Sequence, residues 1–232
     1  MQTRWLLLHG TPLSPEVFDG VRPHLPTPTA VPDLDTLIPA AGSAHSLQRQ
    51  IATKVLAALP DEGDLVVVGH SFGGQVAIEL ALQAPRRVTR LIIVCSRHTP
   101  FPAFARGARA VRAGAPFDID ADLARWFTPQ QLAADPPVIA YLRRRLATAP
   151  RGPWAASLDA IAHYDRSTEV GHIAAPTRLF AAGHDEVATP QVMTQLAETI
   201  PDARLQIVPG WAHMSPFADP AAFGTLLGDA AR

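Results

Sequence analysis

Residues 66–80 read VVVGHSFGGQVAIEL and place Ser71 between a run of branched apolar residues and a pattern of helical spacing. Glycine stands two residues before the serine and two after it, so residues 69–73 fit the pattern G-x-S-x-G. A strand that turns directly into a helix forces the residue at the bend into a strained backbone conformation with positive φ. Only small neighbours let the two backbone segments approach so closely. The stretch therefore predicts a strand, a sharp turn and a helix, with the Ser71 hydroxyl at the bend.

The same geometry favours a role for Ser71 as a nucleophile. At the start of a helix, the free N–H groups and the helix dipole stabilise developing negative charge. The simpler interpretation is a turn with an incidental serine, because G-x-S-x-G alone also occurs by chance. A serine hydroxyl is a poor nucleophile unless a base takes its proton and an acid orients that base. The rest of the chain must therefore supply a histidine and a carboxylate.

Short apolar runs alternate with helical patterns along most of the chain, which is typical of a parallel sheet covered by helices. The chain has 232 residues, of which 47% are hydrophobic, enough to bury one large core. We expect an α/β fold with a mostly parallel sheet of about six strands. The expected strands lie near residues 5–8, 30–31, 65–68, 91–94, 179–182 and 205–208.

Residues 97–165 interrupt this alternation. The segment has no convincing buried strand but several amphipathic helical patterns, which are separated by prolines. It is too long to be a bare loop in a compact domain. We therefore predict that residues 1–96 and 166–232 form the core and that residues 97–165 form a small helical lid, inserted between two strands.

His213, in the segment VPGWAHMSPF, follows the last expected strand and precedes the last expected helix. Loops beyond the carboxyl ends of parallel strands share one crevice, so we expect His213 to reach Ser71 there. A surface histidine is the simpler interpretation of any single candidate, but here strand, loop and chain order agree. His70 adjoins the serine, and its side chain should leave the turn in another direction. His70 is therefore expected to be a packed residue and not the base.

Taken together, these motifs resemble the alpha/beta-hydrolase superfamily over nearly the whole chain. His9-Gly10 after the first strand, GHSFGG at residues 69–74, an acid-bearing loop after the penultimate strand and PGWAHMSP near the end occur in the order of that family. The four motifs together indicate this superfamily far more specifically than any one of them alone. The resemblance implies Ser71 as the nucleophile and His213 as the general base and acid.

The resemblance also implies an oxyanion hole made by the backbone N–H groups of Thr11 and Phe72. Pro12 fits this assignment, because it biases Thr11 toward an extended conformation. The sequence departs from the family in opening almost directly on the first strand, where relatives often begin with a β-hairpin. The sheet should therefore be smaller than in those relatives.

The position of the acid is ambiguous in the segment AAGHDEVATP, where Asp185 and Glu186 are adjacent. Counted forward from Pro176, before the strand, the acid position of the family falls on Asp185. Counted back four residues from Pro190, which opens the next helix, it falls on Glu186. Strand ends are the more rigid reference. We therefore favour Asp185, keep Glu186 as the alternative, and expect the other residue to be a solvated loop charge.

The expected lid looks like that of 3-oxoadipate enol-lactonases and related small-ester hydrolases, mainly through WFTP and its spacing to PTRLFAAG. Such lids supply part of the substrate pocket. For each aromatic of the lid, packing onto the core is the simpler role. Arg143–Arg145 offer a clamp for a substrate carboxylate, but consecutive helical residues point in three directions, which favours a solvated helix face. The aromatic residues that offer apolar walls to a substrate are Phe101, Phe104, Trp126, Phe127 and Trp154.

We predict an enzyme of the esterase and lactonase type, a serine hydrolase that cleaves a small carboxylic ester, lactone or thioester through an acyl-enzyme intermediate. No metal or organic cofactor is needed for this chemistry. One alternative is a carbon–carbon bond hydrolase or a cofactor-free lyase that uses the same Ser71, His213 and Asp185. A second is a non-catalytic small-molecule binding protein of the same fold, which would have no chemical need for the complete catalytic set.

Charge and hydropathy limit the expected partners. The net charge is −1 and the 20 Lys and Arg residues are scattered, which argues against binding to nucleic acid or an anionic membrane. No segment reaches the ~18 consecutive apolar residues of a membrane span, and the run before His9 is typical of a strand and not of a signal peptide. The single cysteine, Cys95, cannot form an internal disulfide. We expect a cytoplasmic monomer or homodimer.

Overall fold

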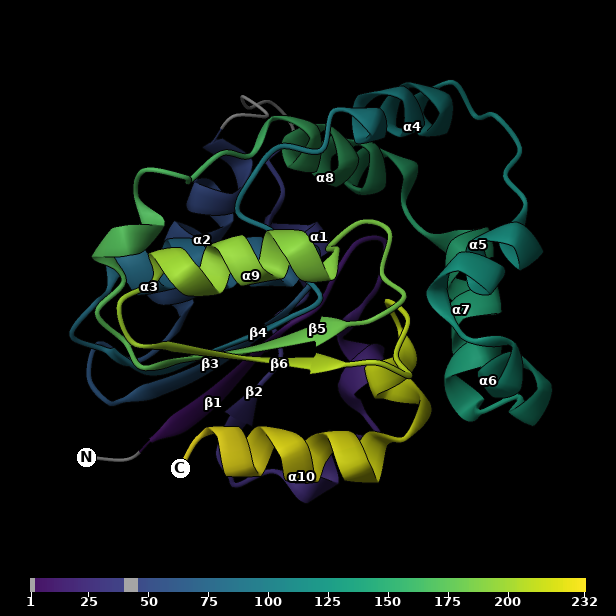
Figure 1. Cartoon of the computed structure of the whole chain (residues 1–232). Helices are drawn as coiled ribbons and strands as arrows, with labels where there is room; N and C mark the ends of the chain where they lie inside the picture. Colours follow the sequence, from purple (N-terminus) through teal and green to yellow (C-terminus); the bar gives the residue numbers. More distant parts are fainter. Residues whose placement is uncertain (1–2, 40–45) are drawn as a thin grey trace.

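The computed structural model describes residues 3–39 and 46–232, which form a six-stranded sheet flanked by helices (Figure 1). Neighbouring strands are parallel throughout, in the order β2-β1-β3-β4-β5-β6. The predicted α/β fold with about six parallel strands is confirmed. The strands are β1 (Arg4–Leu8), β2 (Thr29–Ala30), β3 (Leu65–His70), β4 (Val88–Val94), β5 (Thr177–Ala182) and β6 (Ala203–Val208).

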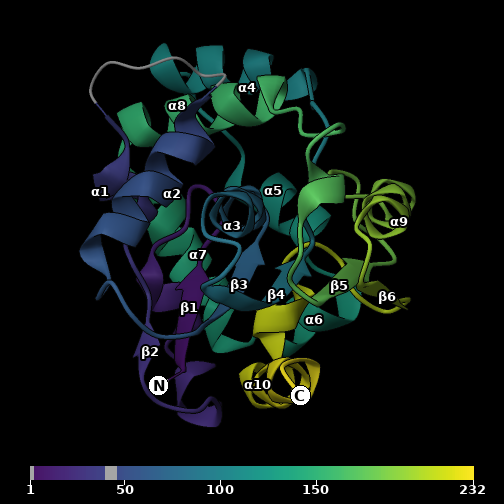
Figure 2. The same ribbon diagram turned by 90° about the vertical axis from the view of Figure 1, so that its left-hand side faces the viewer.

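Helices cover both faces of this sheet, which is why the central strands are almost continuously apolar. On one face lie α2 (Leu47–Ala58), α3 (Phe72–Gln83) and α9 (Pro190–Thr199), and on the other lies α10 (Pro220–Ala230) (Figure 2). Side chains alternate between the faces along each strand. Leu6 and Leu8 join the core under α2 and α3, whereas Trp5 and Leu7 join the core on the α10 side.

Shorter helical segments connect the strands and main helices. Proline opens α9 and α10, and in each case the preceding residue caps the helix: Thr189 Oγ1 accepts the Val192 N–H at 3.3 Å, and Asp219 Oδ1 accepts the Ala222 N–H at 3.0 Å. No helix in the described parts of the chain is long and apolar enough to cross a membrane. The short segments are η1 (Pro15–Phe18), η2 (Arg22–His24), α1 (Leu34–Leu37), η4 (Val170–His172) and η5 (Ser215–Ala218).

A group of helices is inserted between β4 and β5, within the range where the sequence predicts a lid. In Figures 1 and 2, α4 and α8 lie side by side over the face that carries α2 and α3, while α5, α6 and α7 lie beyond the carboxyl ends of the strands. Both halves contribute to the core, through Ile161 on one face and Leu142 on the other. The inserted helices are α4 (Ala103–Arg112), α5 (Ile119–Trp126), α6 (Pro129–Ala134), α7 (Pro137–Thr148) and α8 (Arg151–His163).

Candidate active site

Ser71 forms the bend between β3, which ends at His70, and α3, which begins at Phe72. Its φ of 54° lies in the left-handed region that non-glycine residues rarely adopt, as the sequence predicts. An added Cβ at Gly69 would lie 2.4 Å from the Gly73 carbonyl oxygen, so strand and helix approach closely only because glycine stands there. This close approach is why the chain carries so little side-chain bulk on either side of Ser71.

The neighbouring strand holds the strained bend in place. The Ser71 N–H donates to the Val94 carbonyl at 3.0 Å, and the Ser96 hydroxyl donates to the Ser71 carbonyl at 2.7 Å. Ser96 was not singled out from the sequence, because a serine just after a strand has no distinguishing pattern. These two hydrogen bonds fix the N–H and the carbonyl group of Ser71. The Ser71 side chain can therefore rotate while its backbone stays in place.

Ser71, His213 and Asp185 form one line of hydrogen bonds at the carboxyl end of the sheet. His213 Nε2 lies 3.1 Å from Ser71 Oγ, and His213 Nδ1 lies 2.6 Å from Asp185 Oδ2. In a neutral histidine with this orientation, the Ser71 hydroxyl donates to Nε2 while Nδ1–H donates to the carboxylate. The three residues are therefore arranged so that the imidazole can take the hydroxyl proton.

Asp185, and not Glu186, is the carboxylate that contacts His213. The other oxygen of Asp185 accepts the Val187 and Ala188 N–H groups at 2.8 and 2.9 Å, and the side chain is 1% exposed. Burial alone would raise the pKa of Asp185, but the His213 ring and the two N–H groups outweigh burial and hold this pKa below its ordinary value. Glu186 is exposed. The count from the strand end therefore located the contacting residue.

His70 packs against His213 and holds its backbone. Its Nε2–H donates to the His213 carbonyl at 3.0 Å, and its ring lies 4.9 Å from the His213 ring between centroids. Burial, together with the neighbouring His213, lowers the pKa of His70 to about 3. His70 is therefore a neutral, packed residue, as the sequence predicts, and it fixes the backbone that carries His213.

The inserted helices contact the residues that follow His213. The Met214 N–H donates to the Trp126 carbonyl at the end of α5, at 2.9 Å. The Ser215 hydroxyl donates to Gln131 Oε1 in α6 at 2.7 Å. These contacts join residues far apart in the chain, so no local pattern predicts them. The position of His213 therefore depends partly on where α5 and α6 lie.

The loop of residues 10–14, called the Thr11 loop below, passes directly beside Ser71. An added Cβ at Gly10 would lie 2.9 Å from the Ser71 Cβ. Phe72 opens α3, so its N–H has no acceptor within the helix. The two residues predicted to form an oxyanion hole thus stand on the two backbone segments that adjoin Ser71.

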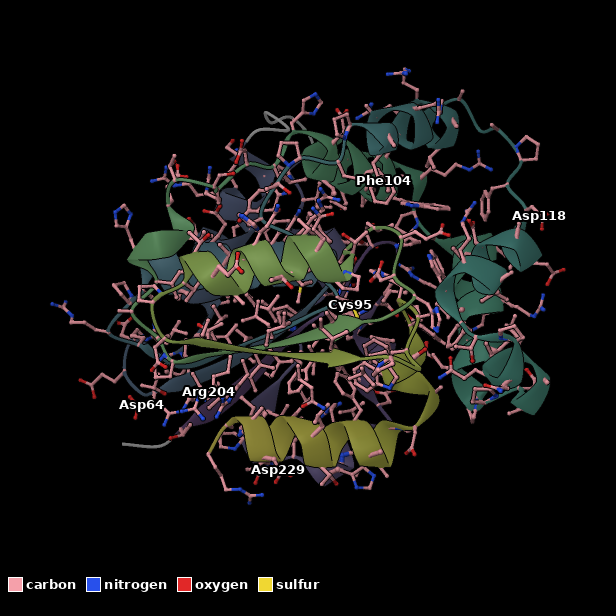
Figure 3. The ribbon with its side chains drawn as sticks, viewed as in Figure 1. Asp64, Cys95, Phe104, Asp118, Arg204 and Asp229 are labelled. Atoms are coloured by element: carbon pink, nitrogen blue, oxygen red, sulfur yellow. The ribbon has the colours of Figure 1, made fainter. Side chains whose placement is uncertain are left out.

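A small pocket lies beside Ser71, beneath α4 and α8. Its free volume of about 10 Å³ admits about one water molecule. Figure 3 shows Cys95 at the carboxyl end of the sheet and Phe104 on the side of α4 that faces the core. The pocket is lined by Ser71, Phe72, Gln75, Cys95, Ser96, Arg97, Phe104, Ile161, Val187 and Ala188.

Phe104 is the one aromatic of the inserted helices in this lining. Phe101 packs edge-on against Phe104, with 4.9 Å between ring centroids, while Phe127 and Trp154 are buried in apolar clusters. Trp126 packs beside the same cluster as Phe127. Packing, the simpler role, accounts for these four positions in the structure, and their contact with a substrate stays a prediction.

Cys95 offers a second nucleophilic atom in the same pocket. It directly follows β4 and is fully buried. Burial raises the pKa of the Cys95 thiol well above its ordinary value, and the negative charge of Asp185 raises this pKa further. The thiolate is the nucleophilic form of cysteine. Cys95 therefore stays neutral, and Ser71 is the better-placed nucleophile.

A wider hollow of about 540 Å³ lies away from Ser71. It adjoins the amino ends of β1 and β3, where Trp5 and Val66 form part of its wall with residues of α10. Its lining includes none of Ser71, His213 and Asp185, which lie at the opposite end of the sheet.

The predicted solvated face at Arg143–Arg145 is wrong for one of the three residues. Arg143 and Arg144 are 50% and 57% exposed and pair with Asp120 and Glu16. The Arg145 side chain is only 16% exposed and points into the protein, toward the Thr11 loop. Successive residues of a helix are about 100° apart, so three consecutive arginines cannot share one environment.

The whole chain can now be compared with known proteins. The model of the "Alpha/beta hydrolase family" matches residues 5–225. The chain belongs to this family. A pimeloyl-[acyl-carrier protein] methyl ester esterase of Nitrosomonas europaea is 28% identical in an alignment of 236 positions that covers 91% of this chain and 88% of that protein. Lipase LipV of Mycobacterium tuberculosis is 34% identical in an alignment of 182 positions that covers 69% of this chain and 65% of that protein.

A solved structure shows the same fold. The enol-lactonase from Burkholderia xenovorans LB400 superposes with a TM-score of 0.85 at 22% identity, covering 99% of this chain and 91% of that one. The resemblance to the alpha/beta-hydrolase superfamily, drawn from the motifs, is confirmed. So is the prediction of an enzyme of the esterase type within this family.

Proposed function

We propose that the protein is a serine hydrolase that cleaves small carboxylic esters, lactones or thioesters through an acyl-enzyme on Ser71. The observation that carries the proposal is the unbroken line from Ser71 Oγ to His213 Nε2, at 3.1 Å, and from His213 Nδ1 to Asp185, at 2.6 Å. Such a line makes a serine hydroxyl nucleophilic at neutral pH.

In the first half-reaction, Ser71 Oγ attacks the carbonyl carbon of the substrate while His213 accepts the hydroxyl proton. Asp185 holds the imidazole in the required tautomer and stabilises the imidazolium. The negative charge moves to the former carbonyl oxygen, which the N–H groups of Thr11 and Phe72 bind. His213 then gives its proton to the leaving alcohol or thiol, and the acyl group remains on Ser71.

In the second half-reaction, a water molecule takes the place of the leaving group. His213 removes a proton from this water, whose oxygen attacks the acyl carbon, and the same two N–H groups bind the second oxyanion. The proton then returns from His213 to Ser71 Oγ as the carboxylic acid leaves. Each proton transfer uses the same nitrogen, Nε2, so no further titrating group is required.

Residues 97–165 act as a lid in this proposal. Their helices border the pocket beside Ser71 through Phe104 and Ile161. Since the pocket is only about 10 Å³, a substrate has to displace these side chains to enter. The acyl pocket is therefore expected between α4, α8 and the start of α3, and the substrates are expected to be small.

The expected setting of the enzyme is the cytoplasm, as a monomer or homodimer. The single cysteine supports this expectation, because a chain with one cysteine gains no internal disulfide in an oxidising compartment. Gel filtration with light scattering tests the oligomeric state, and fractionation of the producing cell tests the compartment.

Hydrolysis of p-nitrophenyl esters of increasing acyl length by the wild type, Ser71→Ala and Glu186→Gln tests the proposal. We expect Ser71→Ala to lower kcat by about 10⁶-fold, and Glu186→Gln, a solvated neighbour of the acid, to keep the wild-type rate. The acyl length with the highest kcat/KM gives the size of the pocket. Equal turnover by Ser71→Ala and the wild type would contradict the proposal. Cleavage of a matched diketone, with every ester left intact, would favour carbon–carbon bond hydrolysis.

A further inference from the structure

Helix α7 contacts the Thr11 loop and its continuation through Tyr141, Arg144 and Arg145. Tyr141 and Arg145 are four residues apart and therefore lie on the same side of the helix, whereas Arg144 is turned about 100° away from Arg145. The Tyr141 hydroxyl accepts the Ser14 N–H at 2.8 Å, and Arg144 pairs with Glu16. Of the two arginines, Arg145 is the more deeply buried. The inserted helices thus reach the oxyanion side of the site as well as the histidine side.

Arg145 makes three contacts at once. Its Nε–H donates to the Pro12 carbonyl at 2.7 Å and its Nη2–H donates to the Leu13 carbonyl at 3.1 Å. Nη2 also pairs with the Asp35 carboxylate in α1. The two carbonyls directly follow Thr11 in the chain. One guanidinium group therefore joins α7, α1 and the loop that carries the predicted oxyanion donor.

Stability alone does not account for this buried pair. The Arg145 and Asp35 side chains are 16% and 8% exposed, so both charges lose much of their hydration on folding. Replacing a buried ion pair with apolar residues is often neutral or stabilising. A planar guanidinium, however, can bind several acceptors in one fixed geometry, which a lysine or an apolar residue cannot do. The contacts to Pro12 and Leu13 are thus the part of the arrangement that needs arginine.

The Thr11 loop and the residue before it also have attachments that do not involve α7. The Leu13 N–H donates to the Gly10 carbonyl at 3.1 Å and closes a turn around Thr11. The Leu34 N–H of α1 donates to His9 Nε2 at 3.0 Å. Without Arg145, the Pro12 and Leu13 peptide groups would lose their attachment to α7, and the Thr11 N–H would shift relative to Ser71. A displacement of about 1 Å at a reacting group can cost 10²-fold in rate.

We propose that Arg145 is a positioning residue, which holds the Thr11 N–H at the oxyanion by binding the Pro12 and Leu13 carbonyls from α7. The inference rests on the proposed serine hydrolase function. Arg145 touches neither the substrate nor Ser71 in this account. The docking of α7 on the Thr11 loop therefore sets the turnover rate and leaves ground-state binding of the substrate unchanged.

The test compares Arg145→Met, Arg145→Lys and the double variant Arg145→Met/Asp35→Asn with Arg144→Met. The double variant removes both buried charges, so that no carboxylate is left buried and unpaired. Arg144→Met changes the adjacent residue, whose ion pair is exposed. For each protein, kcat and KM are measured on the p-nitrophenyl ester that the wild type cleaves fastest. Inhibition by phenylboronic acid, which forms a tetrahedral adduct with the serine, reports the binding of a transition-state mimic.

In Arg145→Met and in the double variant, kcat should be about 10²-fold lower than in the wild type, with little change in KM. Inhibition by phenylboronic acid should be weaker by a similar factor. Arg145→Lys should fall between these variants and the wild type, and Arg144→Met should match the wild type within about twofold. Urea unfolding of each variant shows whether a loss of kcat comes from loss of the folded state. The double variant should unfold cooperatively and so remain folded under the assay conditions.

The proposal is overturned if the folded double variant keeps the wild-type kcat, or if KM rises while kcat stays constant. It is also overturned if phenylboronic acid binds the double variant as tightly as the wild type. A wild type that hydrolyses no ester would instead contradict the proposed function, so the two failures are distinguishable.

Discussion

On one side of Ser71, Asp185 is fixed by the N–H groups of residues two and three positions further along the chain. His213 on the same side is fixed by a hydrogen bond from His70, which adjoins Ser71 in the chain. On the other side, the Thr11 loop is held by Arg145, whose contact to Pro12 joins residues 133 positions apart. The first side is built mainly from the loops of the parallel sheet. The second depends on the inserted helices.

In the proposed mechanism, the two regions control different parts of the chemistry. Proton transfer in this mechanism uses the hydrogen bonds that join Ser71, His213 and Asp185. These three residues belong to the core, and α5 and α6 reach them through contacts to Met214 and Ser215. In the proposed mechanism, oxyanion binding uses the Thr11 loop, which Arg145 of α7 joins to Asp35 of α1. Changes to the core side should therefore alter the pH dependence and proton transfer, whereas changes to α7 should alter transition-state binding.

Apart from loss of the nucleophile itself, the largest effect is expected on the core side, for Asp185→Asn. An amide in place of the carboxylate accepts from the Val187 and Ala188 N–H groups but favours the wrong tautomer of His213, so kcat should fall by about 10⁴-fold. Steady-state kinetics on a p-nitrophenyl ester measure this. Glu186→Gln is the matched control and should keep its activity. If Glu186→Gln were the more damaging variant, the assignment of the acid would be wrong.

A smaller loss is expected on the other side, for Gly10→Ala. The added methyl group would lie 2.9 Å from the Ser71 Cβ, so the Thr11 loop has to move away from the nucleophile. Loss of one oxyanion donor costs about 10²–10³-fold in kcat. Because the proton relay stays intact, the pH–rate profile should keep its shape.

Gly152→Ala in α8 is the control for Gly10→Ala, since an added Cβ at Gly152 meets nothing within 4 Å. A rate for Gly10→Ala equal to that of Gly152→Ala would mean that the loop does not contribute to the transition state. A changed pH–rate profile would mean that the two sides are not separable.

A third prediction concerns stability against pH on the core side. The folded protein holds His70 neutral down to pH about 3, whereas in the unfolded chain it binds a proton near pH 6.5. The unfolded state therefore binds more protons in this interval, and stability falls as the pH is lowered through it. His70→Gln removes this titration and keeps a side-chain donor for the His213 carbonyl.

Urea unfolding at pH 7 and pH 4.5 measures the effect. The free energy of unfolding should decrease less between these two values for His70→Gln than for the wild type. Equal decreases in the two proteins would show that His70 is not held neutral by burial.

The smallest effect is expected for Arg143→Met, two residues before Arg145. The pair of Arg143 with Asp120 is exposed on both sides, at 50% and 76%, so solvent screens it and its loss should change the free energy of unfolding by less than about 1 kcal/mol. Turnover should not change. A large loss of kcat here would mean that any disturbance of α7 reaches the site, and the specific role of Arg145 would lose its support.

The sequence predicted the elements of the fold and the relay because their signals are local. The strand, turn and helix around Ser71 follow from fifteen adjacent letters. Chain order then placed His213 in the same crevice. Asp185 followed from the resemblance to the alpha/beta-hydrolase superfamily, whose acid position was counted from a strand end.

The remaining contacts could not be read in this way. Arg145 and Asp35 are 110 positions apart, and which of three consecutive arginines faces inward depends on the rotation of α7 against the core. The same holds for Phe104, the aromatic that lines the pocket, among the five aromatics that were equally plausible from sequence. Contacts across the inserted helices are properties of tertiary packing, and no periodicity encodes them.

The most direct test of the central claim is covalent trapping of the nucleophile. The wild type, Ser71→Ala and Cys95→Ser are incubated with a fluorophosphonate, and intact mass and peptide mapping locate the adduct. The account predicts one adduct on Ser71 in the wild type and in Cys95→Ser, formed at the same rate in both, and none in Ser71→Ala. Labelling of Ser71→Ala at the wild-type rate, or an adduct on any residue other than Ser71, would contradict the claim that this serine is the nucleophile.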